Sequence, residues 1–176
     1  MNQAISEIIS RRSCRAYDPN KKLSKEQINE VLSAGLYAPT GKNTQQTIFI
    51  TVTNPEMLKK LSDLNRRIGG WKEGFDPFYG APCAIIVIAP KDYNNAVYDG
   101  SLGLGYMMLA AKSLGLGSCW IHRAKEAFEM PEGKKLLQDL GIEGDYIGIG
   151  NLALGYPLNQ DVVPKKIKEG RLYFVD

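Results

Sequence analysis

Histidine is nearly absent from this sequence, which has His122 as its one histidine among 176 residues. A metal site built from several histidines, or catalysis by a histidine pair, is therefore excluded. Cysteine is also scarce: Cys14, Cys83 and Cys119 are odd in number, far apart and without the short spacing of zinc ligands. Scattered cysteines of this kind predict reduced thiols, no metal site and a cytoplasmic setting.

Long apolar runs and strong net charge are missing as well. No uninterrupted apolar stretch reaches membrane-spanning length, and the opening MNQAISEIISRR carries charge where a secretory signal would be apolar. A net charge of +3 is too small to indicate a nucleic-acid partner. Repeats and low-complexity tracts are absent. We therefore expect a cytoplasmic protein without membrane or nucleic-acid partners, and 176 residues suffice for one domain, 1–176, with its own core.

Helix and strand patterns are interspersed along the chain. Apolar spacing and a Ser24–Gln27 capping box predict helices, β-branched and apolar runs predict strands, and a Gly- and aromatic-rich stretch at 67–80 predicts a loop. The expected helices are 3–11, 24–37, 55–66, 99–114 and 125–139, and the expected strands are 47–53, 83–89, 146–155 and 171–175, with a short strand or turn at 118–123. This mixture predicts a layered α+β or α/β domain.

The end of the chain is apolar after a long polar segment. The run LYFV follows residues 159–171, which could carry it across a surface. A terminal strand has to pair with a sheet edge. That edge could belong to the same subunit or to a partner.

Two basic clusters lie near opposite ends of the chain. The stretch RRSCR (11–15) holds three arginines, and PKKIKEGR (164–171) holds a second group of cations. A solvated helix end is the simplest interpretation of the first cluster. The two clusters together fit a bound phosphate if the chain ends meet.

A polar loop lies between a helix and a strand at APTGKNTQ (38–45). Gly41 permits close backbone approach, and Thr40, Asn43 and Gln45 supply hydrogen-bond donors and acceptors. Such side chains fit the edge of a flat heteroaromatic ring.

These motifs resemble, in order and over nearly the whole chain, the FMN-dependent nitroreductase family: RRSCRAYD, APTGKNTQ, FYGAPCAIIVIA, LAAKSLGLGSCWI and ALGYP. The resemblance implies a three-layer α+β fold, with a central, mostly antiparallel sheet between helices. It also implies a homodimer with FMN at the interface and a C-terminal strand that could be exchanged with the partner subunit. The flavin would be reduced by NADH or NADPH and reoxidised by a small acceptor, such as a nitroaromatic or quinone, in a ping-pong mechanism.

The resemblance also implies roles for individual residues. The residues placed near the phosphate and ribityl chain are Arg11, Arg12, Ser13, Lys166 and Lys168. Arg15 is placed at the pyrimidine edge of the flavin, and the side chains placed around the ring are those of Thr40, Asn43 and Gln45. The backbone of His122 and Arg123 is placed at flavin N5. Because the flavin supplies the chemistry, no catalytic side chain is required. His122 is the one candidate, and a lone histidine is more often packed or solvated.

The chain departs from the family pattern at two places. Gly105 and Tyr106 stand where relatives often carry amide side chains. The aromatic segment 67–80 stands in place of a longer insertion that covers the flavin in other members, and it could serve as a flavin lid or as a dimer contact.

Two other functions stay open. One is different flavin chemistry on the same fold: enone reduction, reductive dehalogenation or flavin consumption. The other is a non-enzymatic flavin-binding module.

Overall fold

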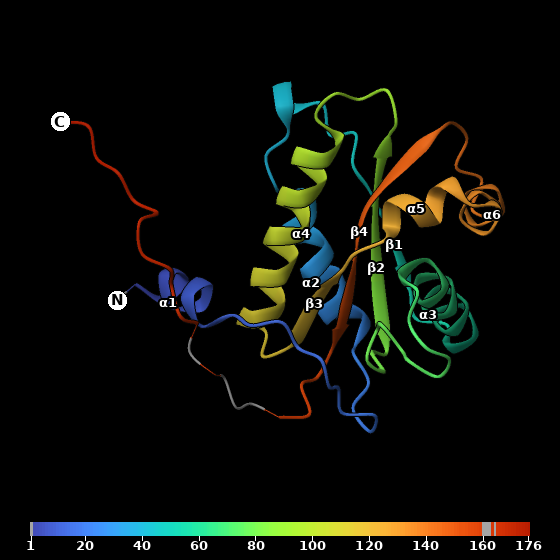
Figure 1. Ribbon diagram of the computed structural model, residues 1–176, viewed down its shortest axis with the longest axis horizontal. Helices are drawn as coiled ribbons and strands as arrows, with labels where there is room; N and C mark the ends of the chain where they lie inside the picture. Colours follow the sequence, from blue (N-terminus) through green and yellow to red (C-terminus); the bar gives the residue numbers. More distant parts are fainter. Residues whose placement is uncertain (1, 160–162, 164) are drawn as a thin grey trace.

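A four-stranded antiparallel sheet forms the centre of the protein in the computed structural model, which describes residues 2–159, 163 and 165–176 (Figure 1). The strand order is β1-β2-β4-β3, and every pairing is antiparallel. The strands are β1 (Ile48–Val52), β2 (Cys83–Pro90), β3 (Gly117–Ile121) and β4 (Tyr146–Gly155). The predicted antiparallel sheet is confirmed, and the uncertain 118–123 segment contains a strand.

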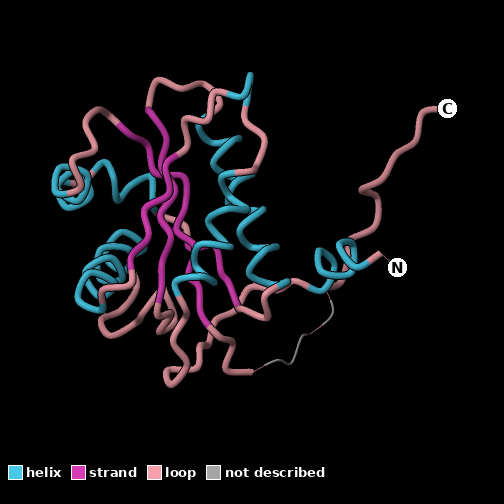
Figure 2. The backbone as a smooth tube through the Cα atoms, turned by 180° about the vertical axis from the view of Figure 1, so that it is seen from behind, coloured by secondary structure: helices cyan, strands magenta, loops and turns pink. Residues whose placement is uncertain are grey.

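Helices cover both faces of the sheet, which gives the three layers visible in Figures 1 and 2. One face packs against α2 (Lys25–Leu36) and α4 (Ala96–Ser113), and the other against α3 (Pro55–Gly69), α5 (Ala124–Glu129) and α6 (Pro131–Asp139). Each interface encloses its own apolar core. Helix α1 (Gln3–Ser10) lies outside these layers against α4, and a short turn of 3-10 helix, η1 (Gly41–Asn43), precedes β1. Among the described residues, no helix is both long and apolar enough to cross a membrane.

Local sequence signals account for the helix ends. Ser24 Oγ accepts the Gln27 N–H at 3.2 Å while Gln27 Oε1 accepts the Ser24 N–H at 3.1 Å, which is the predicted capping box. Asn54 caps α3 through one hydrogen bond, in which its Oδ1 accepts the Met57 N–H at 3.0 Å, and Gly70, with a φ of 67°, ends the helix. The predicted helix over 55–66 therefore runs three residues further than expected.

Two predicted elements are wrong. The helix expected over 125–139 is two helices, because Pro131 begins α6 and holds Met130 in an extended conformation. The strand expected over 171–175 is absent from the single chain: this segment has no regular structure, and Val175 is fully exposed. In Figure 1 the tail leads away from the body of the molecule. An apolar strand needs an edge to pair with, and in one chain this segment does not meet one.

A β-bulge divides β4 into two halves. Val87 pairs with Gly150 and Ile88 pairs with Gly148, so Ile149 is an extra residue without a partner on β2. The bulge changes which residues face each layer. The β4 side chains that point toward α2 and α4 are those of Ile147, Ile149, Leu152 and Leu154. Ala153 packs on the opposite side of the sheet.

Candidate functional site

The basic segment 11–15 lies against the beginning of β3. Ser13 forms a parallel bridge with Ser118, and the Cys14 N–H donates to the Ser118 carbonyl oxygen at 2.9 Å. Cys14 also fills the space beside Gly117, where a larger residue would clash with its sulfur. Backbone pairing and close packing thus fix the position of the segment RRSCR.

Arg11 has an unsatisfied nitrogen. This residue ends α1, and its Nη1 is buried without a hydrogen-bond partner among the described residues. A buried donor without an acceptor costs free energy, and a cation makes that cost larger. The arrangement fits an anionic ligand such as a phosphate group.

Arg12 has a different environment although it is the next residue. Its Nε donates to the Val163 carbonyl oxygen at 3.0 Å, and its Nη1 donates to the carbonyl oxygens of Ile9 at 2.7 Å and Arg11 at 2.8 Å. Arg12 therefore holds the beginning of the C-terminal tail against α1. The two ends of the chain meet at this contact, as the phosphate hypothesis requires.

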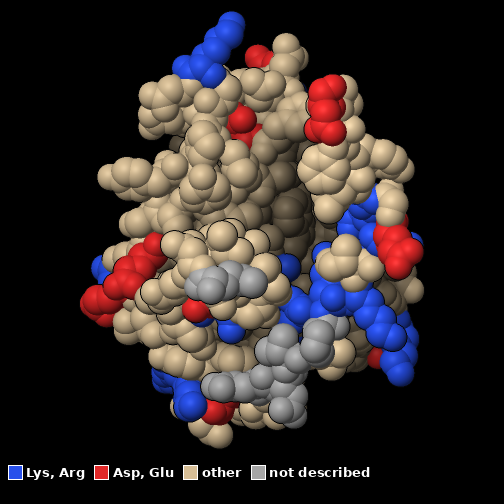
Figure 3. All heavy atoms as spheres, turned by 90° about the vertical axis from the view of Figure 1, so that its left-hand side faces the viewer, with Lys and Arg blue, Asp and Glu red and all other residues tan. Residues whose placement is uncertain are grey.

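The tail lysines follow this contact closely in sequence. Lys166 and Lys168 are three and five residues beyond Val163, and both are exposed. Figure 3 shows Lys and Arg side chains gathered at the lower end of a hollow on this face. A phosphate at Arg11 would thus lie in a basic environment.

The other predicted site residues near the basic segment lie along strand β3 or directly after it. Ser13 lies at its beginning, and the guanidinium of Arg15 lies near Cys119 in its middle. Burial raises the pKa of the Cys119 thiol, and the Arg15 charge and a hydrogen bond with Ser13 partly offset this rise. His122 and Arg123 follow the end of the strand. The segment that contains Ser13 and Arg15 and the turn with His122 and Arg123 therefore lie along one strand, and their roles toward a flavin stay predictions.

A buried amide pair supports the turn after β3. Asn151 Nδ2 donates to the carbonyl oxygens of Ile121 at 3.4 Å and His122 at 3.5 Å, and to Asn65 Oδ1 at 3.4 Å. Asn65 and Asn151 are 1% and 2% exposed. Arg123 has a φ of 77°, and its guanidinium pairs with Glu126 at 3.0 Å. The amide pair was not predicted, although an asparagine inside the apolar run of β4 was a signal for it.

The polar loop 38–45 lies far from the basic segment. The Gly41 N–H donates to Asp99 in the first turns of α4, whereas Arg11 lines a groove together with Ser113, the last residue of the same helix. Ser113 is fourteen positions after Asp99 in α4, which corresponds to a rise of about 21 Å along the helix. Figure 1 shows η1 and α1 toward opposite ends of α4. In one chain, Thr40, Asn43 and Gln45 therefore do not join the arginines.

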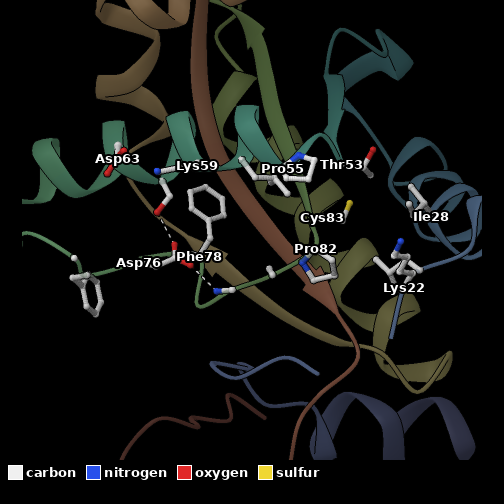
Figure 4. A pocket seen from close by; sticks show the side chains of 17 residues that line it. Lys22, Ile28, Thr53, Pro55, Lys59, Asp63, Asp76, Phe78, Pro82 and Cys83 are labelled. Atoms are coloured by element: carbon white, nitrogen blue, oxygen red, sulfur yellow. Dashed lines mark hydrogen bonds between the residues drawn. The ribbon is translucent and has the colours of Figure 1, made fainter. Parts of the chain in front are cut away.

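Two of the larger hollows on the described surface bear on the predicted site. A groove of about 830 Å³ lies between α1 and α4, with Arg11, Tyr106 and Gly105 among its lining residues. A second cavity of about 760 Å³ lies between α3 and residues 74–82 (Figure 4), and no predicted site residue lines it. The aromatic 67–80 segment borders this second cavity, and Phe78 is 3% exposed within the core. Phe78 is thus a packing residue rather than part of a lid.

Comparisons with known proteins agree on one family. The model of the nitroreductase family matches residues 8–156. A protein from Archaeoglobus fulgidus provisionally named NADH dehydrogenase/NAD(P)H nitroreductase is 33% identical over 91% of this chain and 88% of its own. A crystal structure of a nitroreductase with bound FMN from Bacteroides fragilis has a TM-score of 0.90 at 31% identity, with full coverage of both chains. The FMN reductase [NAD(P)H] of Bacillus subtilis is 24% identical over 96% of this chain and 72% of its own.

Proposed function

Because the chain belongs to the nitroreductase family, we propose that residues 1–176 form a single FMN-binding domain of an NAD(P)H-dependent oxidoreductase. NADH or NADPH is the reductant, and a small molecule such as a nitroaromatic or quinone is the acceptor. The two substrates use the same face of the cofactor in turn, in a ping-pong mechanism. FMN, when bound, supplies the hydride chemistry. The observation that carries the proposal is the buried Nη1 of Arg11, which has no hydrogen-bond partner in the part of the chain that the structure describes.

The residues around β3 bind and orient the cofactor in this proposal. Arg11 and Ser13 hold the phosphate and the ribityl chain, with Lys166 and Lys168 from the tail nearby. Arg15 faces the pyrimidine edge. Asn151 fixes the carbonyl oxygens of Ile121 and His122, and so orients the following backbone N–H groups toward the ring. The exposed His122 side chain borders the space that a substrate enters.

A homodimer completes the site. Exposed apolar side chains are concentrated on α1, α4 and the tail, where they would meet water in a monomer. They are Ile5, Ile8, Ile9, Val97, Tyr98, Leu102, Tyr106, Val163, Ile167, Leu172, Tyr173, Phe174 and Val175. A second copy packed on this face buries them. It also brings the loop 38–45 of one subunit to the arginines of the other, which lie toward opposite ends of α4 in one chain.

Titration of FMN into the apoprotein tests the phosphate assignment. Arg11→Ala removes a charge-assisted contact worth about 1.5–3 kcal/mol, so affinity should fall at least about tenfold. Lys60→Ala removes an exposed cation from α3, on the opposite layer, and should leave affinity unchanged. Equal affinity in Arg11→Ala and the parent would contradict the assignment.

Turnover separates the enzyme from a binding module. The FMN-loaded protein should oxidise NADH or NADPH steadily when a quinone or nitroaromatic is present, and a panel of acceptors would rank them. A protein that retains FMN but oxidises neither nucleotide with any acceptor would be a flavin carrier.

Use of FMN as a substrate is a second candidate, favoured by the similarity to an FMN reductase. An enzyme of that kind reduces many equivalents of added FMN for each subunit. Retention of one FMN per subunit through gel filtration, without multiple turnover of added FMN, supports the first function instead.

A further inference from the structure

The polar loop contains three residues in an unfavourable backbone conformation. Lys42, Asn43 and Gln45 have φ values of 54°, 54° and 51°, in the left-handed region that side chains other than glycine rarely adopt. Such conformations persist only where the surrounding structure fixes them. The contacts that fix this loop therefore decide where its side chains lie.

One buried carboxylate provides the main contact. Asp99 is 7% exposed, and its two oxygens accept the Gly41 N–H at 3.1 and 3.2 Å. Its Oδ2 also accepts the Tyr93 O–H at 2.6 Å, and the Tyr93 hydroxyl lies 2.7 Å from Thr44 Oγ1. Asp99 thus holds the loop to α4 at two points, directly at Gly41 and through Tyr93 at Thr44.

Contacts within the loop transmit this anchoring to its polar side chains. Thr40 Oγ1 accepts the Gln45 N–H at 3.1 Å, and Gln45 Nε2 donates to Asn43 Oδ1 at 3.0 Å. Asn43 and Gln45 are nevertheless exposed. Their polar groups are therefore held in a fixed arrangement on the surface, available to a ligand.

We propose that Asp99 is a positioning residue for the flavin site of the partner subunit. It does not touch the cofactor, and it acts through Gly41 and Tyr93 to hold Asn43 and Gln45 in place. This inference rests on the proposed function, because the loop reaches a flavin only across the dimer.

Two substitutions separate charge from shape. Asp99→Ala removes every acceptor and frees both anchor points. Asp99→Asn keeps the shape: its oxygen can accept the Gly41 N–H, and its amide can donate to the Tyr93 oxygen, whose O–H then donates to Thr44. FMN affinity of the apoprotein should fall about tenfold in Asp99→Ala, and Asp99→Asn should recover much of this loss.

A core truncation controls for loss of stability. Met107 is fully buried on the same helix, and Met107→Ala should lower the melting temperature without changing FMN affinity. If Asp99→Ala binds FMN as the parent does while Arg11→Ala does not, the positioning role is overturned and the proposed function stands. If Arg11→Ala also binds FMN as the parent does, the phosphate site of the proposed function has failed.

Mixed dimers test the action across subunits. An Arg11→Ala subunit is coexpressed with an Asp99→Ala subunit, each with its own affinity tag, and the heterodimer is isolated by sequential purification. One site then combines an intact arginine with an intact loop, and the other combines both defects. We expect one tightly bound FMN per heterodimer and substantial recovery of activity over either homodimer. Two weakened sites would mean that Asp99 acts within its own subunit, and would overturn the inference.

Discussion

Arg11 and Arg12 are neighbours in the chain, yet their guanidinium groups have different surroundings. Arg12 donates to the carbonyl oxygens of Ile9, Arg11 and Val163, whereas a nitrogen of Arg11 is buried and meets no acceptor within residues 2–159, 163 and 165–176. The sequence RRSCR predicts a basic cluster but cannot assign these roles, because they depend on carbonyl groups that the fold brings close. Val163 is 151 residues away from Arg12.

Arg15, in the same basic segment, should change the reduction potential of the flavin rather than the affinity for it. Negative charge develops at the pyrimidine edge on two-electron reduction, so a cation there stabilises the reduced form more than the oxidised form. Loss of a partly screened contact of about 1–2 kcal/mol lowers a two-electron potential by about 20–45 mV. Arg15→Gln should therefore keep most of its FMN and become harder to reduce. Equilibration with redox dyes measures this.

Arg11→Ala is the matched comparison for the potential. It should lose FMN with little change in the potential of the FMN that remains, because the phosphate carries charge in both redox states. An unchanged potential in Arg15→Gln would place this arginine away from the ring.

At the scale of elements, signals within a few residues predicted the structure well. The Ser24–Gln27 box placed the start of α2, and the apolar run at 83–89 placed β2. Pro131, in the middle of the single helix predicted over 125–139, is a local signal for the start of α6. The resemblance predicts the loop 38–45 and the arginines at one flavin, and the place of this loop at the other end of α4 depends on tertiary packing. A signal for its anchor existed, because Asp99 is the one acidic residue in the apolar stretch of α4.

Strand β2 gives the protein a predictable sensitivity to alkali. Burial raises the pKa of Cys83, the first residue of β2, to about 12. Between the ordinary thiol range and pH 12 the unfolded chain loses this proton while the folded chain keeps it, so the free energy of unfolding falls as pH rises. The slope contributed by one such group is about 1.4 kcal/mol per pH unit.

Cys83→Ala should make that fall less steep. Urea unfolding at several pH values between about 9 and 11 measures the slope, and the comparison uses slopes because the substitution itself lowers stability at every pH. Identical slopes in the two proteins would show that Cys83 does not titrate in this way.

At the scale of the whole molecule, no contact among the described residues explains the apolar character of the tail. Leu172, Tyr173 and Phe174 are each more than 80% exposed, although Arg12 fixes the tail at Val163. A surface of this kind is stable in water when a partner covers it. The tail can form a strand only if the partner offers a sheet edge to pair with. The sequence of a single chain does not show whether a partner offers such an edge.

Deletion of residues 171–176 should therefore lower dimer stability and FMN content together. Light scattering at micromolar concentration and flavin absorbance measure the two quantities on the same sample. The conservative control is Tyr173→Phe, which removes one hydroxyl and its contact with Gly170 and keeps the apolar area. A flavin-loaded monomer of the full chain would refute the shared site.

The bulge at Ile149 determines which face of the sheet the residues after it in β4 point toward, including Asn151. Regular alternation from Ile147 through Ile149 would point residue 151 toward α2 and α4. The extra residue shifts the phase by one, and Asn151 faces Asn65 and the turn after β3 instead. Deletion of Ile149 would restore a regular ladder and leave Asn151 facing the turn, because Asn151 would then lie three positions after Ile147. A single irregularity in hydrogen bonding between β2 and β4 thus keeps Ile147, Ile149, Leu152 and Leu154 toward α2 and α4 while the amide of Asn151 supports the turn after β3.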